Sequence, residues 1–416
     1  MSKSLILVIT AVFLLVTGTF ISGTILTPYA QDIGASWVQI GILSASMYVV
    51  RLFVGTPVGR LADKKGTLEV LKYSLMLYPI IAIAYWFSSN IFSLIFTRLL
   101  HGLASAMMLP MGMAYIGQAA PKGKEGRFVA IYNSCVLLAS GIGPFISTIV
   151  AGFNHHRNYR ATFATLFVLA VMAFLILLLS RNGQKKPAGG YNGVDGNRNR
   201  NRNGNGNGNA SSTGLIKNQR IMALSAANIA LAVISSLIGF FLIPFLEEMG
   251  MELIFTGSII AIYNIISGMI QIPLGKITDR YNKINIIVLS GVFISLALMI
   301  FPLTKNIWII IAAMIIVSMG SAALLASTSA LSVIVGREAG MGSTMGFLST
   351  SNSVGMVFGC IALSFMPGAG YNYKALFIFS SITLIVCTIL FTVLWNMKRS
   401  AVLKENNTGS FRDINQ

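Results

Sequence analysis

The sequence predicts an all-α membrane protein with twelve transmembrane helices arranged as two related six-helix halves. Of 416 residues, 55% are apolar and only 10% are charged, whereas a soluble protein of this size carries about 25% charged residues. Apolar runs long enough to span a bilayer recur along the whole chain, with a mean hydropathy of +0.75. In lipid such runs must be helical, because every backbone N–H and C=O needs an internal partner.

The boundaries of the spans follow from the apolar runs. The first run is longer than the apolar core of a signal peptide and ends without a small-residue cleavage site, so we expect it to remain in the protein as a helix. The predicted spans cover residues 5–30, 38–61, 68–88, 91–116, 127–152 and 160–180, then 220–245, 254–277, 284–304, 306–333, 342–366 and 374–397.

The net charge of +18 follows from topology. Of the 30 Lys and Arg residues, 24 fall on the side of the amino terminus, four fall on the other side, and two lie within helices. This asymmetry obeys the positive-inside rule and predicts a multi-pass plasma-membrane protein with both termini in the cytoplasm. The basic excess therefore needs no nucleic-acid partner.

An internal repeat relates the two halves. A segment rich in Asn, Gly and Arg separates them, and such a composition predicts a disordered linker. We expect a monomer with a six-helix bundle at 1–180, a cytoplasmic linker at 181–218, a second bundle at 219–397 and a cytoplasmic tail at 398–416. At a constant offset of 216 residues, the matching pairs include Gly23 and Gly239, Pro28 and Pro244, Asp32 and Glu248, Pro57 and Pro273, Gly59 and Gly275, and Asp63 and Asp279.

The loop after the second predicted span carries the most specific motif. Residues 59–66 read GRLADKKG, and residues 275–280 read GKITDR in the equivalent loop of the second half. The glycine permits close approach of helices, and the aspartate can meet the positive end of a neighbouring helix. The motif residues are Gly59, Arg60, Asp63, Lys64 and Gly66 in the first half, and Gly275, Lys276, Asp279 and Arg280 in the second.

This motif resembles the signature between helices 2 and 3 of the major facilitator superfamily, G-x-L-a-D-r-x-G-r-k. The resemblance covers 1–180 and 219–397, and it implies two bundles that rock around a central substrate path. In the family the motif is thought to latch the outward-facing state, and the resemblance implies the same latch here. Thr67 and Leu68 stand where the family favours further basic residues.

Two cations inside the predicted helices are the strongest functional pointers. Burying an Arg in hydrocarbon costs ~2.5–3.5 kcal/mol even on the translocon scale, so Arg51 and Arg98 are expected to face the bundle interior or an aqueous cavity. Arg98 and Gly102 match an R-x-x-x-G pattern that resembles proton-coupled members of the family. His101 lies one turn from Arg98, where it either lines the cavity or packs inside the bundle.

Asp32 is the nearest candidate to neutralise these cations. It lies at the outer end of the first span, where it could approach Arg98 in the folded bundle. A carboxyl group that alternates between an Arg partner and a buried environment changes its pKa and could carry a proton. The alternative is that Asp32 caps the loop, and its match with Glu248 favours that role.

Helix 5 contains a second partial motif. Export members of the family show G-P followed two residues later by G-G, whereas Gly143 and Pro144 are followed here by Ser147 and Thr148. The match therefore supports export only in part. A bend and close packing of the helix are an equally direct explanation.

These features predict a secondary active transporter of small molecules, with proton-coupled efflux of amphipathic compounds or metabolites as the preferred function. Uptake or facilitated diffusion of an organic anion or sugar is the alternative, as is a sensor that keeps the fold without transport. The sequence contains no P-loop, H-E-x-x-H motif or nucleophile elbow, so an enzyme is not expected. No metal or cofactor is expected either, because the three cysteines fall in different helices and form no ligand cluster.

Overall fold

The computed structural model describes residues 3–151, 158–179, 218–242, 245–246, 250, 253–304, 306–368 and 373–410. Within these ranges, twelve helices are long and apolar enough to cross a membrane, which confirms the predicted fold class. The predicted linker at 181–218 lies outside the described residues except for its last residue. The exact domain boundaries remain predictions.

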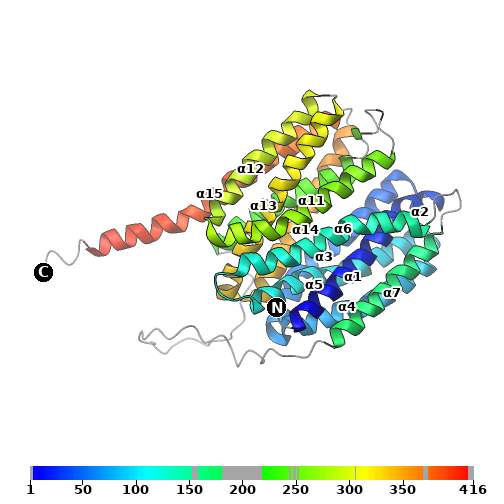
Figure 1. Cartoon of the computed structure of the whole chain (residues 1–416), viewed down its shortest axis with the longest axis horizontal. Coiled ribbons are helices and arrows are strands. Elements are labelled where there is room, and N and C mark those ends of the chain that lie inside the picture. Colours follow the sequence, from blue (N-terminus) through cyan, green and yellow to red (C-terminus); the bar gives the residue numbers. More distant parts are fainter. Residues whose placement is uncertain are drawn as a thin grey trace.

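The first six spans form one bundle (Figure 1). α1 packs against α6 and α7, while α5 packs against α3 and α4. The elements are α1 (Lys3–Thr24), α2 (Leu26–Asp32), α3 (Trp37–Lys65), α4 (Thr67–Phe87), α5 (Ile91–Ala119), α6 (Glu125–Ala151) and α7 (Tyr159–Leu178).

The second bundle repeats this arrangement. α9 packs against α14 and α15, and α13 packs against α11 and α12, as the internal repeat requires. The elements are α9 (Gln219–Ser236), the π-helix η1 (Leu237–Phe241), α11 (Leu253–Arg280), α12 (Lys283–Ile300), the 3₁₀ turn η2 (Phe301–Leu303), α13 (Ile307–Ala339), α14 (Met341–Gly368) and α15 (Tyr373–Ser410).

The first predicted span is broken near its end, where α1 stops at Thr24 and α2 begins at Leu26. Pro28 explains the break, because its ring clashes with the carbonyl group four residues earlier, which belongs to Thr24. In the second bundle, the π-helix η1 ends at Phe241, the position equivalent to Ile25. Both halves therefore depart from regular α-helix at the same place in the repeat.

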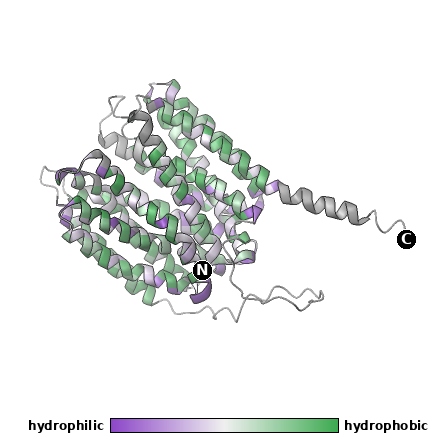
Figure 2. Ribbon diagram, turned by 180° about the vertical axis from the view of Figure 1, so that it is seen from behind, coloured by the Kyte–Doolittle hydropathy of each residue, from purple (hydrophilic) through white to green (hydrophobic). Residues whose placement is uncertain are grey.

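Hydrophobic residues dominate the long helices, and hydrophilic residues gather at several helix ends (Figure 2). Many large apolar side chains are exposed in the absence of lipid, for example Phe53, Phe92 and Trp308. Such a surface is expected where hydrocarbon replaces water as the solvent.

Each bundle also has a buried apolar core of its own. The first core includes Tyr78, Tyr85 and Phe163, and the second includes Phe301 and Phe377.

Candidate functional site

The two bundles meet through α3 with α14 and through α6 with α11. One end of the molecule carries the loops after α3 and α11 together with the first turns of α6 and α14. We call this end the motif end, and the other the opposite end. The sequence motifs therefore lie where the bundles can contact each other.

Asp63 of the first bundle caps a helix of the second. Its carboxylate accepts hydrogen bonds from the backbone N–H of Gly342 at 2.7 Å and of Ser343 at 2.8 Å. These groups lie in the first turn of α14, where N–H donors have no partner within the helix and the helix dipole is positive. Asp63 therefore ties the bundles together with charge-assisted hydrogen bonds.

Asp279 forms the reciprocal contact. Its carboxylate accepts from the backbone N–H of Gly126 at 2.7 Å and of Arg127 at 3.0 Å, in the first turn of α6. The aspartate here belongs to the second bundle and the helix to the first. The two halves thus exchange the same contact in both directions.

Glycines allow the backbones to come close enough for this exchange. A Cβ atom at Gly59 would overlap the carbonyl oxygen of Gly342, and one at Gly346 would lie 2.8 Å from the Cα atom of Gly59. In the reciprocal contact, a Cβ atom at Gly275 would lie 2.8 Å from the carbonyl oxygen of Gly126. Any side chain at these positions would push the bundles apart at the motif end.

Arg337 adds a contact that has no counterpart in the repeat. It lies in the last turn of α13 and forms an ion pair with Glu125 at the start of α6. It also donates to the carbonyl oxygen of Gly117 at 3.1 Å and to that of Ala120. Both side chains are largely removed from solvent, so breaking the pair would leave a poorly hydrated charge. Sequence reasoning did not single out either residue.

The remaining motif residues shape the loops. Gly66 joins α3 to α4 with φ of 98°, a conformation that favours glycine. Lys64, Lys276 and Arg280 are exposed at the motif end. The Nε atom of Arg60 is buried and has no hydrogen-bond partner within the described part of the chain.

A buried cationic cluster occupies the interior of the first bundle. Arg51 of α3 is only 8% exposed, and its guanidinium group lies 5.7 Å from the centre of the Tyr48 ring. Tyr48 lies two turns before Gly55, on the face of α3 that packs against Gly346 and Thr350 of α14. This edge of the cluster therefore lies at the boundary between the bundles.

Arg98 and His101 extend the cluster on α5. The Nη1 atom of Arg98 lies 3.7 Å from the sulfur of Met47. The Nδ1 atom of His101, which is 2% exposed, lies 3.2 Å from the Tyr85 hydroxyl. Gly102 makes the cluster compact, because a Cβ atom there would lie 2.6 Å from the carbonyl oxygen of Met47.

The structure does not bring Asp32 to Arg98. The exposed carboxylate of Asp32 instead accepts a hydrogen bond from the hydroxyl of Tyr159 on α7. Among the described residues, the ion pairs are Lys72 with Glu69, Arg220 with Glu338, and Arg337 with Glu125. Neither Arg51 nor Arg98 has a carboxylate partner in that set.

Comparison with known proteins decides the family. The sequence model of the Major Facilitator Superfamily matches residues 8–359 and, in a second match, residues 224–412. The chain belongs to the major facilitator superfamily.

Individual relatives of this chain agree with its assignment to the superfamily. An uncharacterised MFS-type transporter of Methanocaldococcus jannaschii is 25% identical over 397 residues, covering 93% of this chain and 97% of the relative. The quinolone resistance protein NorA of Staphylococcus aureus is 24% identical over 190 residues, only 45% of this chain and 47% of NorA. The E. coli fucose:proton symporter FucP superposes with a TM-score of 0.73 at 12% identity, covering 94% and 98% of the two chains. At that identity the superposition shows the fold alone.

Gly143 and Pro144 lie within α6 of the facilitator. A Cβ atom at Gly143 would meet the side chain of Phe20 on α1, at 2.5 Å from its Cβ atom. One turn further on, the Ser147 hydroxyl donates to the carbonyl oxygen of Ile21 at 2.8 Å. Ser147, which stands where the export motif has a glycine, therefore helps to pack α6 against α1.

The second half of the facilitator lacks the cationic cluster. At the offset of 216 residues, Met314 stands in place of Arg98 and Ser267 in place of Arg51. The hydroxyl oxygen of Ser267 lies 2.8 Å from that of Ser318. At these two pairs of equivalent positions, only the first bundle carries a positive charge.

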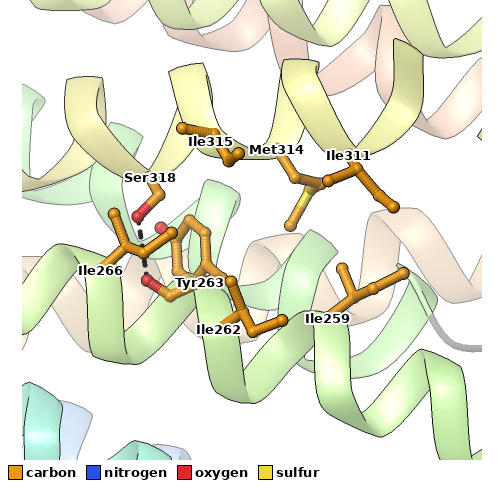
Figure 3. A pocket seen from close by; sticks show the side chains of 8 residues that line it. All are labelled: Ile259, Ile262, Tyr263, Ile266, Ile311, Met314, Ile315 and Ser318. Atoms are coloured by element: carbon orange, nitrogen blue, oxygen red, sulfur yellow. Dashed lines mark hydrogen bonds between the residues drawn. The ribbon is translucent and has the colours of Figure 1, made fainter. Parts of the chain in front are cut away.

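A pocket between α11 and α13 occupies this equivalent region (Figure 3). Its lining is apolar except for a tyrosine and a serine, and the serine hydroxyl donates to the backbone carbonyl of the tyrosine at 2.9 Å. The lining residues are Ile259, Ile262, Tyr263, Ile266, Ile311, Met314, Ile315 and Ser318.

Proposed function

We propose that this superfamily member works by alternating access and exports small amphipathic compounds in exchange for protons. The observation that carries alternating access is that the polar contacts between the bundles gather in one half of the molecule. Among the described residues, the hydrogen bonds and the ion pair between bundles all lie toward the motif end. Releasing these contacts would open a path at that end.

The reciprocal caps suit such a gate. Each cap consists of two hydrogen bonds from backbone N–H groups, which are formed or lost together as the helix moves. Loss of a helix cap typically costs 0.5–2 kcal/mol. Two caps of this strength are strong enough to bias a gate and weak enough for bound substrate to overcome.

The direction of transport and its coupling to protons rest on other observations. NorA, a quinolone resistance protein, matches about half of this chain. The Arg98–Gly102 pattern resembles proton-coupled members, and Gly143-Pro144 resembles part of the export motif. That Asp32 carries a proton stays a prediction beside its alternative role as a loop cap, and its partner in the structure is Tyr159 rather than Arg98.

Uptake or facilitated diffusion of an organic anion is the second candidate. The observation that favours it is the absence of a carboxylate partner for Arg51 and Arg98 among the described residues. Cations without a protein counter-ion favour an anionic substrate. A sugar would be recognised chiefly by neutral hydrogen-bonding groups, so this observation does not favour it.

Accumulation in cells tests both candidates. A panel of fluorescent cations and labelled organic anions is compared in cells with the protein, without it, and with Arg98→Ala, each with and without an uncoupler. Proton-linked export predicts lower accumulation of at least one compound, with the difference removed by the uncoupler and by Arg98→Ala. Higher accumulation of an anion would reverse the direction, and no effect on any compound would contradict transport.

Glu125→Gln and Arg337→Gln should each reduce the initial transport rate roughly tenfold. Each substitution leaves the other member of a partly buried pair without its partner and so weakens closure at the motif end. The double variant should recover part of the rate, because no unpaired charge remains. Rates are measured per folded protein at the membrane.

The matched control is Arg220→Gln. It removes an exposed ion pair with Glu338, at 3.8 Å, that lies within the second bundle. Exposed pairs contribute little, so the rate should change by less than about twofold. A double Glu125/Arg337 variant slower than either single variant would show that the pair is not the relevant interaction.

A further inference from the structure

We infer that Arg51 and Tyr48 bind the negatively charged group of an amphipathic organic anion at the boundary between the two bundles. This assignment names a substrate class and rests on the proposed transport function. It is carried by the orientation of Arg51, by the absence of an ion pair to Arg51 among the described residues, and by the neutral residues of α14 near Tyr48.

The spacing of α3 shows where Arg51 lies. Ile42, Val49 and Phe53 are 52%, 36% and 72% exposed and mark the lipid face of the helix. Arg51 is two residues from both Val49 and Phe53, which is about 200° around a helix with 3.6 residues per turn. Arg51 therefore lies on the side away from lipid, consistent with its 8% exposure.

Within the described ranges, no carboxylate neutralises the guanidinium group of Arg51. The Nε atom of Arg51 is buried and has no hydrogen-bond partner among the described residues. The guanidinium group makes a cation–π contact with the Tyr48 ring. Among the residues that the structure describes, no ion pair includes it. Arg98 on α5 adds a second positive charge to the same interior. A buried cation that lacks a protein counter-ion favours a ligand that brings one.

The surface opposite Tyr48 is neutral and polarisable. α3 and α14 run antiparallel, with Gly59 beside Gly342 and Gly55 beside Thr350. This register brings Tyr48 to the height of Met356, one turn before Cys360, whose sulfur lies 4.0 Å from the hydroxyl oxygen of Ser236. That oxygen lies 3.5 Å from the sulfur of Met356. Sulfur-containing side chains adapt to apolar and aromatic groups of varied shape.

Arg51 and the neutral residues near Tyr48 together define the chemistry of the ligand. A carboxylate or sulfonate matches the planar donors of a guanidinium group, which can hold it with two parallel hydrogen bonds. An aromatic or aliphatic body attached to that group would lie beside Tyr48 and Cys360. Because the equivalent position in the second half is Ser267, the anionic end is expected on the side of the first bundle only.

Three probes of the same shape test the charge requirement. Benzoate, benzamide and benzamidine are respectively anionic, neutral and cationic. The purified full-length protein, with Cys135 and Cys387 replaced by Ser, is treated with N-ethylmaleimide, and the rate of Cys360 alkylation is measured with each probe. The midpoint of thermal unfolding with each probe is the second readout. Benzoate should protect Cys360 and raise the midpoint at concentrations at least tenfold below those required of the other two.

Variants of Arg51 separate binding from folding. Arg51→Gln should weaken the effect of benzoate at least tenfold, whereas Arg51→Lys should retain part of it. Arg51→Gln alone should not lower the unfolding midpoint, because it removes an uncompensated buried charge. The matched control is Arg160→Gln, since Arg160 also lies over an aromatic ring, that of Trp86 at 6.0 Å, but is exposed.

The outcomes distinguish the site from the transport function. Equal effects of benzamidine and benzoate, no effect of any probe, or benzoate binding unchanged in Arg51→Gln would each overturn the anion site. A lower unfolding midpoint for Arg51→Gln together with unchanged benzoate binding would assign Arg51 a structural role. Benzoate binding without flux in proteoliposomes would keep the site and reject the transport function.

Discussion

A disulfide between positions 56 and 350 should stop transport, and its reduction should restore transport. Thr56 on α3 and Thr350 on α14 belong to different bundles, and their hydroxyl oxygens lie 3.2 Å apart. Cysteines at these positions would hold the bundles in contact at the motif end. Alternating access requires that contact to open in every cycle, so the cross-linked protein should retain less than about a tenth of the flux.

The measurement uses proteoliposomes and a background in which Cys135, Cys360 and Cys387 are replaced by Ser. Flux of a transported compound is recorded after oxidation and again after reduction, and the cross-linked fraction is determined on the same sample. The matched control is Ser88→Cys with Thr97→Cys, whose hydroxyl oxygens are also 3.2 Å apart but within the first bundle. That cross-link should leave flux unchanged. Full flux through a completely cross-linked 56/350 pair would exclude opening at this contact.

Gly59→Val should have the second largest effect, a loss of transport to roughly a tenth or less. Its Cβ atom would meet the carbonyl oxygen of Gly342 and lie 3.1 Å from the Cα atom of Gly346. Overpacking of this kind costs about 1–3 kcal/mol, which corresponds to a change in the closed population of roughly 5- to 150-fold at tenfold per 1.4 kcal/mol. Alternating access requires the bundles to separate at this contact in the open state, which would relieve the overlap, so the protein should still fold.

Gly41→Val is the matched control on the same helix. No heavy atom lies within 4 Å of a Cβ atom built at Gly41. Gly41→Val changes the helix propensity of α3 in the same way as Gly59→Val does, but it leaves the contact between the bundles unchanged. We expect normal transport from Gly41→Val, and slow formation of the 56/350 disulfide in Gly59→Val. Equal transport by the two glycine variants would show that close approach at Gly59 is not required.

Most of the fold could be predicted from the sequence because the bilayer leaves little choice. A chain of long apolar runs must form helices, and the repeat at 216 residues implies two similar bundles. The predicted spans agree with the helices to within a few residues at most ends. The exceptions are α13, which continues to Ala339 beyond the predicted end at 333, and α15, which continues to Ser410 beyond the predicted end at 397 and into the predicted tail. The polar last turns of such helices lie outside the apolar run and are invisible to hydropathy.

Only part of the candidate site could be predicted from the sequence. The two motif aspartates could be found because they repeat, but the partner of each is a backbone N–H, which no side-chain pattern reveals. The ion pair of Glu125 with Arg337 joins residues 212 apart, and neither has an equivalent in the repeat. The position of Tyr48 beside α14 likewise depends on how the two bundles dock. The contact of Asp32 with Tyr159 could not be predicted either, because the two residues are 127 apart in the sequence.

The reciprocal exchange of aspartate caps has a consequence for the ancestry of the protein. A contact in which residue i of one body touches residue j of the other, and j touches i, is the kind that a two-fold symmetric pair makes. Two separate copies of a six-helix ancestor could therefore have closed on each other through the same caps before any gene fusion. Arg51, Arg98 and Arg337, which lack equivalents, are then the residues by which a fused chain could distinguish its two halves and give its central path a charged side.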